Sequence, residues 1–136
     1  NAPEGWRLPT DEDWKKLERA MGMSQGDADA MGFRGTMEGT LLQQDVTGTG
    51  IALPLGGYAI VLGRPATLRF RHWREFGYFW TATEEKNETP FPDAYYRKIS
   101  FRSSQIERGI TRIVDSNYET NYPKHMSVRY VRDAVD

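Results

Sequence analysis

Two short runs of the sequence combine flat aromatic side chains with arginine, the residue types with which proteins often hold a sugar. One run is Trp73-Arg74 and the other is Tyr95-Tyr96-Arg97. An aromatic ring stacks on a sugar face, and a guanidinium donates hydrogen bonds to nearby oxygens. These five residues are the candidate ligand-binding set. The alternative, a tyrosine packed on a sheet with only its hydroxyl in water, stays open.

In the basic segment from Arg64 to Arg74, arginines alternate with apolar side chains. In other proteins such side chains bind phosphates and stack on nucleic-acid bases. Glu75 follows immediately, and acids exceed bases by one over the whole chain. We therefore expect a solvent-facing strand here rather than a nucleic-acid site. An anionic glycan or a partner protein would suit the same arginines. Tyr118, in a polar segment, is also expected to be exposed.

Patterns for catalysis and metal binding are weak. His72 and His125 are far apart in the sequence and lack the spacing that places two ligands on one metal. No Gly-x-Ser-x-Gly elbow is present, and the adjacent Glu84 and Glu85 are typical of a solvated turn. The absence of cysteine excludes thiolate chemistry and disulfides. We expect no catalytic residue, no metal and no cofactor.

The elements that must position these residues begin with a helix over 11–21. Thr10 and Asp13 are spaced as a capping box at its start. Its core-facing stripe is formed by Trp14, Leu17 and Met21. A second helix is predicted over 25–33, and residues 35–50, rich in Gly, Thr and Gln, predict a loop.

Beyond position 57, short β-branched and aromatic segments separated by turn-forming residues predict a sheet. The predicted strands are Tyr58 to Leu62, Leu68 to His72, Tyr78 to Ala82, Tyr95 to Arg102, Ile110 to Val114 and Ser127 to Arg132. In the fourth strand, alternation places Tyr95, Ile99 and Phe101 on one face. A helix also fits the apolar spacing over 106–114, but Gly109 within that run favours strands.

A chain of 136 residues suits a single domain spanning 1–136. The longest mostly apolar stretch, Ile51 to Leu62, is interrupted by proline and glycine and is shorter than the roughly 20 residues of a membrane helix. Because the first residue is Asn1 rather than methionine, we expect a domain excised from a longer exported protein. A signal peptide, a lipoprotein leader and another domain all stay open as the upstream segment.

Five blocks of the sequence occur in an order typical of one bacterial family. They are Pro3-Glu4-Gly5-Trp6-Arg7-Leu8-Pro9-Thr10-Asp11-Glu12-Asp13-Trp14, Leu53-Pro54-Leu55-Gly56-Gly57-Tyr58, Gly77-Tyr78-Phe79-Trp80-Thr81-Ala82-Thr83-Glu84, Ala94-Tyr95-Tyr96-Arg97 and Ser127-Val128-Arg129-Tyr130-Val131-Arg132-Asp133. Together they resemble the Fibrobacter succinogenes major paralogous domain, which is found in exported proteins and lipoproteins of bacteria. Since Trp6, Trp14, Tyr78 and Trp80 fall inside these blocks, we expect them in the core.

The opening Arg7-Leu8-Pro9-Thr10 block is also similar to the start of the formylglycine-generating, sulfatase-modifying domain. These resemblances imply an α+β, C-type-lectin-like fold, with two early helices followed by a twisted antiparallel sheet and with the chain ends close together. Family members usually carry cysteines where this chain has Ala2 and Tyr130, so this chain must be stabilised by packing instead. Neither cysteine-dependent catalysis nor the calcium-dependent sugar motif of C-type lectins is implied.

The resemblance implies a non-catalytic binding module, extracellular or anchored at the outer membrane, whose partner is a glycan or another surface protein. Neither nucleic acid nor a membrane-spanning segment is expected. The alternative is a structural or protein–protein interaction domain of a bacterial surface lipoprotein, because a fold does not determine a function.

Overall fold

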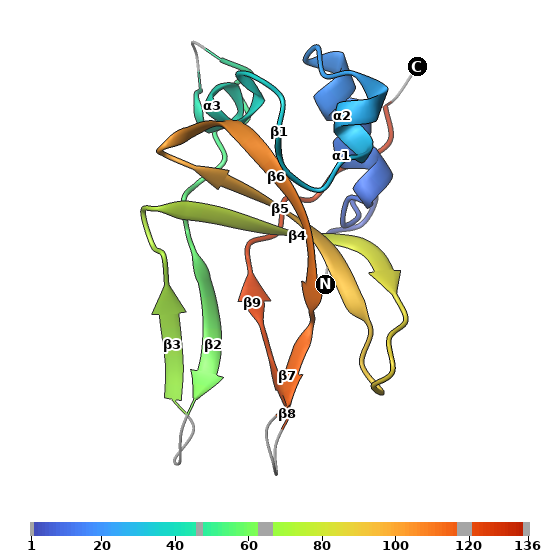
Figure 1. Ribbon diagram of the computed structural model, residues 1–136, viewed down its shortest axis with the longest axis vertical. Coiled ribbons are helices and arrows are strands. Elements are labelled where there is room, and N and C mark those ends of the chain that lie inside the picture. Colours follow the sequence, from blue (N-terminus) through green and yellow to red (C-terminus); the bar gives the residue numbers. More distant parts are fainter. Residues whose placement is uncertain (1, 46–47, 63–66, 117–120, 135–136) are drawn as a thin grey trace.

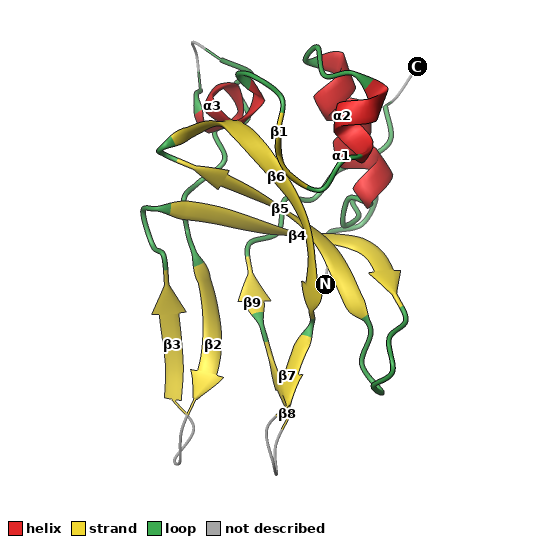
Figure 2. Ribbon diagram, in the orientation of Figure 1, coloured by secondary structure: helices red, strands yellow, loops and turns green. Residues whose placement is uncertain are grey.

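The computed structural model describes residues 2–45, 48–62, 67–116 and 121–134. Helices gather on one side of an antiparallel sheet, and a second group of strands projects from the other side (Figure 1). The predicted α+β class is confirmed, with strands outnumbering helices (Figure 2). Within the described ranges, no helix has both the length and the apolar character needed to cross a membrane.

The main sheet is built from four strands: β1 (Gly32–Arg34), β4 (Phe76–Glu85), β5 (Asp93–Ser100) and β6 (Ser103–Arg112). They are antiparallel and lie in the order β1-β6-β5-β4. A tight turn at Phe101 and Arg102 folds β5 directly onto β6. For this reason β5 ends before the predicted Arg102, and β6 begins at Ser103 rather than at the predicted Ile110. The helical alternative for this segment is wrong.

A smaller sheet has the order β3-β2-β9, and a short hairpin lies beside it. Its strands are β2 (Tyr58–Leu62), β3 (Thr67–Arg71) and β9 (His125–Met126), and the hairpin is β7 (Val114–Ser116) with β8 (Asn121–Pro123). β2 spans its predicted residues, and β3 lies one residue before its predicted position. A parallel bridge between Phe79 and Ser127 connects the segment after β9 to β4.

Helix α1 (Asp11–Ala20) begins where predicted, because Thr10 and Asp13 form the reciprocal capping box. Helix α2 (Gln25–Asp29) ends earlier than predicted, since Ala30 is extended and Gly32, with a φ of 80°, starts β1. A third helix, α3 (Glu38–Gln43), lies in the segment predicted as loop. It packs on β6 so closely that a Cβ at Gly39 would lie 2.0 Å from the carbonyl oxygen of Gln105.

The N-terminal and C-terminal segments lie side by side, as the resemblance implies. Arg7 donates a backbone hydrogen bond to Val131 at 2.7 Å, and Val131 returns one at 2.8 Å. The Arg7 guanidinium also bonds the carboxylates of Asp13 and Asp133. The predicted strand over 127–132 is wrong, because this segment pairs through isolated bridges rather than along a neighbouring strand.

The hydrophobic core lies between the helices and the main sheet. Trp14 is buried at its centre, with its ring centroid 6.1 Å from that of Phe79, and Tyr78 is also buried. Trp80 is half-buried. The prediction that Trp6 belongs to the core is wrong: its side chain is 41% exposed and lies near the chain end, with the Arg132 guanidinium 4.9 Å from its ring.

Candidate functional site

The structure places Arg97 in the interior rather than on a ligand-binding surface. Its side chain is completely buried, its Nε donates to the carboxylate of Glu18 at 2.9 Å, and its Nη1 donates to Asp11 at 2.6 Å. Both acids lie on α1. The prediction that Arg97 contacts a ligand is therefore wrong, because two buried carboxylates already occupy its guanidinium.

Arg97 belongs to a buried network of charges that ties α1 to the main sheet. Arg34 of β1 bonds Glu18 through both terminal nitrogens, at 3.0 and 2.7 Å, and Arg108 of β6 bonds Asp11 at 2.8 Å. Burial opposes ionisation of Asp11, but Arg108 and Arg97 together hold the pKa of its carboxyl below the ordinary value. The network is a structural element of the core.

Tyr95 and Tyr96, although adjacent, point to opposite faces of β5. Tyr95 lies on the same face as the buried arginines: the Arg108 guanidinium is 4.6 Å from its ring, and its hydroxyl donates to Glu85. Tyr96 lies on the other face, where its ring centroid is 6.1 Å from that of Tyr78. The predicted five-residue set is therefore divided among separate surfaces and the core.

Trp73 and Arg74 lie in the turn that joins β3 to β4, and Trp73 is exposed as predicted, at 63%. The Arg74 guanidinium covers one side of its ring at 4.3 Å. His72 and Arg74 both adopt positive φ angles, 58° and 66°, so the turn is locally strained. The expected solvent-facing strand is also confirmed, since every residue of β3 is exposed. Arg64 and Tyr118 lie outside the described residues.

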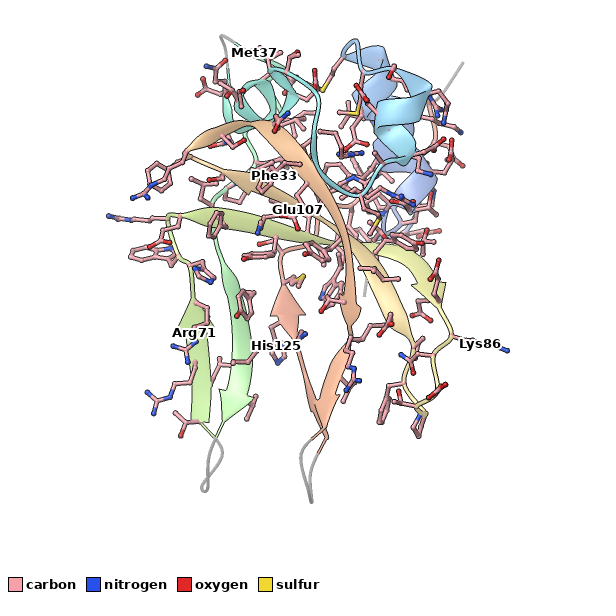
Figure 3. The ribbon with its side chains drawn as sticks, in the orientation of Figure 1. Phe33, Met37, Arg71, Lys86, Glu107 and His125 are labelled. Carbon is pink, nitrogen blue, oxygen red and sulfur yellow. The ribbon has the colours of Figure 1, made fainter. Side chains whose placement is uncertain are left out.

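The face of the main sheet opposite the helices carries a hollow that we call the tyrosine hollow. It has a volume of about 320 Å³ and is lined by Tyr58, Ile60, Tyr78, Tyr96, Thr111, Lys124 and Met126. Both sheets contribute to it, because β2 and β9 bring side chains against the exposed face of β4, β5 and β6. Figure 3 shows the side chains between the two sheets, with Glu107 on the main sheet and Arg71 and His125 on the smaller one.

Aromatic contacts fix the positions of the three tyrosine rings. Tyr58 meets Tyr78 edge to face, with ring centroids 5.1 Å apart and an interplanar angle of 76°. Tyr96 lies across β6 over Gly109, where a Cβ would come within 2.4 Å of its ring. Tyr58, Tyr78 and Tyr96 thus come from three strands, β2, β4 and β5, and form one aromatic wall.

The hydroxyl groups of this wall differ in their hydrogen bonding. Tyr96 donates to Glu107 at 3.1 Å, and Glu107 is paired with Lys98 at 3.0 Å. Over the described part of the chain, the hydroxyls of Tyr58 and Tyr78 have no hydrogen-bond partner. Burial raises the pKa of Tyr78 to about 12, and burial together with Glu107 raises the pKa of Tyr96. Both hydroxyls are neutral at physiological pH.

A cross-strand row supports the hollow from one side. Phe33, Glu107, Lys98 and Tyr78 lie directly opposite one another on β1, β6, β5 and β4. The Lys98 ammonium lies 5.4 Å from the ring of Phe33 and 5.6 Å from that of Tyr78. Lys98 is therefore engaged by rings and by Glu107. Its contribution is to hold the wall in place.

Sequence reasoning included Tyr96 but missed Tyr58 and Tyr78 as site residues. Tyr78 is predicted to lie in the core, and its side chain is indeed buried, but it also lines the hollow. Strand alternation could have found it: Phe79 packs on Trp14 of α1, so Tyr78 must face away from the helices.

A second cavity, of about 250 Å³, lies between α1 and the C-terminal segment. Its lining is mainly apolar and includes Trp14, Leu17, Leu53, Tyr130 and Val131. The Trp14 indole N–H has no hydrogen-bond partner among the described residues. Since its walls are largely core side chains, this cavity offers less hydrogen-bonding capacity than the tyrosine hollow. Among the described residues, no group of three or more His, Asp or Glu is placed to hold a metal ion.

Comparison with known proteins identifies a family but no individual relative. The model of the Fibrobacter succinogenes major domain matches residues 1–132. No curated protein and no solved structure matches the chain. Because the match covers nearly the whole sequence, the chain belongs to the Fibrobacter succinogenes major domain family.

Proposed function

We propose that this domain is a non-catalytic carbohydrate-binding module of an exported bacterial protein, and that the tyrosine hollow is its binding site. The observation that carries the proposal is the pair of hydroxyls on Tyr58 and Tyr78, which have no hydrogen-bond partner among the described residues and are set in a wall of aromatic rings. A sugar presents both an apolar ring face and hydroxyl groups. The hollow complements both features with rings that stack and hydroxyls that donate or accept.

The size and contents of the hollow agree with binding rather than catalysis. Its volume of about 320 Å³ is at the lower end of small-ligand sites, which span about 300 to 1,000 Å³. Glu107, the carboxylate that accepts from Tyr96, is also paired with Lys98. A general acid or base must reach the reacting atom, whereas this carboxylate positions a tyrosine.

We also propose that the architecture is C-type-lectin-like. Support comes from the paired segments at Arg7 and Val131, from the early helices packed on one side of an antiparallel sheet, and from the strands that project from its other side (Figure 1). An experimental structure of this chain superposed on C-type lectin domains checks this proposal. A different strand order in the shared sheet contradicts it.

A glycan array with matched variants tests the carbohydrate proposal. Tyr58→Phe and Tyr78→Phe each remove one hydroxyl and keep the ring, so we expect each to weaken glycan binding by about fivefold, the value of a typical hydrogen bond of about 1 kcal/mol. Tyr95→Phe, on the opposite face, is the control and leaves binding unchanged. Binding that survives both hollow variants contradicts the site, and an array without any bound glycan contradicts the function.

One observation favours a second candidate function, contact with another surface protein. The side chains of Phe70 and Trp73 are 67% and 63% exposed and line, with Gly56, a shallow depression of about 440 Å³. Large exposed aromatic side chains of this kind mark protein contacts in other proteins. Loss of binding to a partner protein in Phe70→Ser and Trp73→Ser variants, with intact glycan binding, would support this function.

A further inference from the structure

Two arginines of β3, Arg69 and Arg71, lie beside residues that line the tyrosine hollow. Arg71 lies directly opposite Tyr58, and Arg69 lies directly opposite Ile60, in the antiparallel pairing of β2 with β3. Directly opposed residues share a face of the sheet, and both Tyr58 and Ile60 line the hollow. Arg69 and Arg71 therefore lie on the hollow side of the smaller sheet, while Phe70 between them lies on the outer face.

These two guanidinium groups are exposed and, over the described residues, have neither a hydrogen bond nor an ion-pair partner. Two acids nearby among the described residues already have other partners. Glu107 is paired with Lys98 at 3.0 Å, and Glu75 lies 3.6 Å from His72. Lys124 adds a further positive charge on the β9 side of the hollow. The face of the smaller sheet that carries Tyr58 and Ile60 is thus cationic, although the whole chain has a net charge of −1.

We propose that the ligand of the tyrosine hollow is an acidic polysaccharide, whose carboxylate or sulfate groups are bound by Arg69 and Arg71 while a sugar ring lies against Tyr58 and Tyr78. This inference rests on the proposed carbohydrate function. A guanidinium binds a carboxylate or a sulfate through two parallel hydrogen bonds. Residues two apart on a strand are about 6.6 Å apart, so the arginines contact neighbouring anionic groups of a polymer.

The same chemistry favours a polysaccharide over a nucleic acid. A single strand of nucleic acid is held by a long basic groove with successive aromatic platforms, and its binding scales with the number of phosphates neutralised. Here, among the described residues of β3, the positive charge without an ion-pair partner lies on two arginines of one short strand. The tyrosine wall presents hydroxyls beside its rings, which suits sugar hydroxyls better than a base stack.

The test compares acidic polysaccharides with neutral counterparts that share their backbone. Polygalacturonate is paired with methyl-esterified pectin, alginate with its propylene glycol ester, and dextran sulfate with dextran; oligothymidylate serves as the nucleic-acid probe. Binding to the intact chain is measured at low and at physiological salt. We expect at least one acidic polymer to bind about tenfold or more tightly than its neutral counterpart, with the difference reduced by salt.

Matched variants locate the effect. In an Arg69→Gln/Arg71→Gln double variant, binding of the acidic polymer falls by about tenfold or more, while an Arg102→Gln/Arg129→Gln variant, which removes the same charge elsewhere on the surface, stays within about twofold. Equal or tighter binding of every neutral counterpart overturns this inference and leaves the carbohydrate function standing. Absence of binding to all the polysaccharides overturns both, and tighter binding of oligothymidylate replaces the polysaccharide with a nucleic acid.

Discussion

The Nε of Arg97 donates to the carboxylate of Glu18 at 2.9 Å, and both side chains are completely enclosed. A buried ion pair of this kind contributes little net stability relative to an apolar pair, but removal of one partner leaves the other charge buried and uncompensated. Arg34 depends on the same carboxylate, at 2.7 Å. Glu18 therefore joins helix α1 to β1 and β5 of the main sheet, beside Asp11, which joins the helix to β5 and β6.

Replacement of Glu18 by glutamine should lower the free energy of unfolding by about 3 kcal/mol or more, because two guanidinium groups lose their shared counter-charge. Glu12→Gln on the same helix is the control: its carboxylate is half-exposed and pairs with Arg19 at 3.2 Å, so a change below about 1 kcal/mol is expected. Urea unfolding measures both variants. Equal effects would show that the enclosed network does not support the fold.

Acid should destabilise the protein through Asp11. Its pKa in the folded protein lies below the ordinary 3.8, so its contribution to stability is present above that pH and is lost as the pH falls below it. The free energy of unfolding in urea, measured between about pH 6 and pH 2, should fall steeply, and the Asp11→Asn variant should be less stable at neutral pH with a shallower decline. If the free energy of unfolding of the variant falls with pH as steeply as that of the original protein, the acid sensitivity comes from other carboxyl groups.

Alkaline pH should destabilise the tyrosine hollow. Burial raises the pKa of Tyr78 from 10.0 to about 12. The contribution of this tyrosine to the free energy of unfolding is therefore fully present below pH 10 and is lost as the pH rises through 12. Urea unfolding at about pH 9 and about pH 11 should show this loss, and Tyr78→Phe should reduce it. A loss of equal size in Tyr78→Phe would mean that the ionisation responsible lies elsewhere.

A methyl group at Gly109 should disturb the hollow, since it would lie 2.4 Å from the ring of Tyr96. Gly109→Ala should cost about 1 to 3 kcal/mol of stability and weaken glycan binding, because the ring must leave its place over β6. Gly26→Ala in α2 is the control: its Cβ enters open space, and a change of at most about 1 kcal/mol, towards greater stability, is expected. Near-ultraviolet circular dichroism reports the movement of the tyrosine ring.

Elements with local signals were predictable from the sequence. The capping box of Thr10 and Asp13 set the start of α1, and β2 coincides with its predicted range. Helix α3 was missed because its segment is rich in residues with weak helical preference; contact with β6 through Gly39 stabilises it there. Such tertiary contact has no local signature in the sequence.

The burial of Arg97 was predictable in part. Alternation along β5 places it on the face of Tyr95 and Ile99, but its charge suggested exposure. Its partners Glu18 and Asp11 lie 79 and 86 residues earlier in the chain, a distance across which one sequence gives no pairing information. The tyrosine hollow escaped prediction for a similar reason: its rings come from three strands, and the pairing of those strands decides which side chains meet.

Titration of the isotopically labelled protein with a bound glycan, followed in amide NMR spectra, is the most direct test of the site. If the tyrosine hollow is the binding site, the largest chemical-shift changes occur at Tyr58, Tyr78, Tyr96 and Thr111. The glycan affinity of Tyr95→Phe is then unchanged, and that of Tyr78→Phe is weaker. Shifts confined to the segment from Phe70 to Arg74 would move the binding surface to the outer face of β3 and contradict the account.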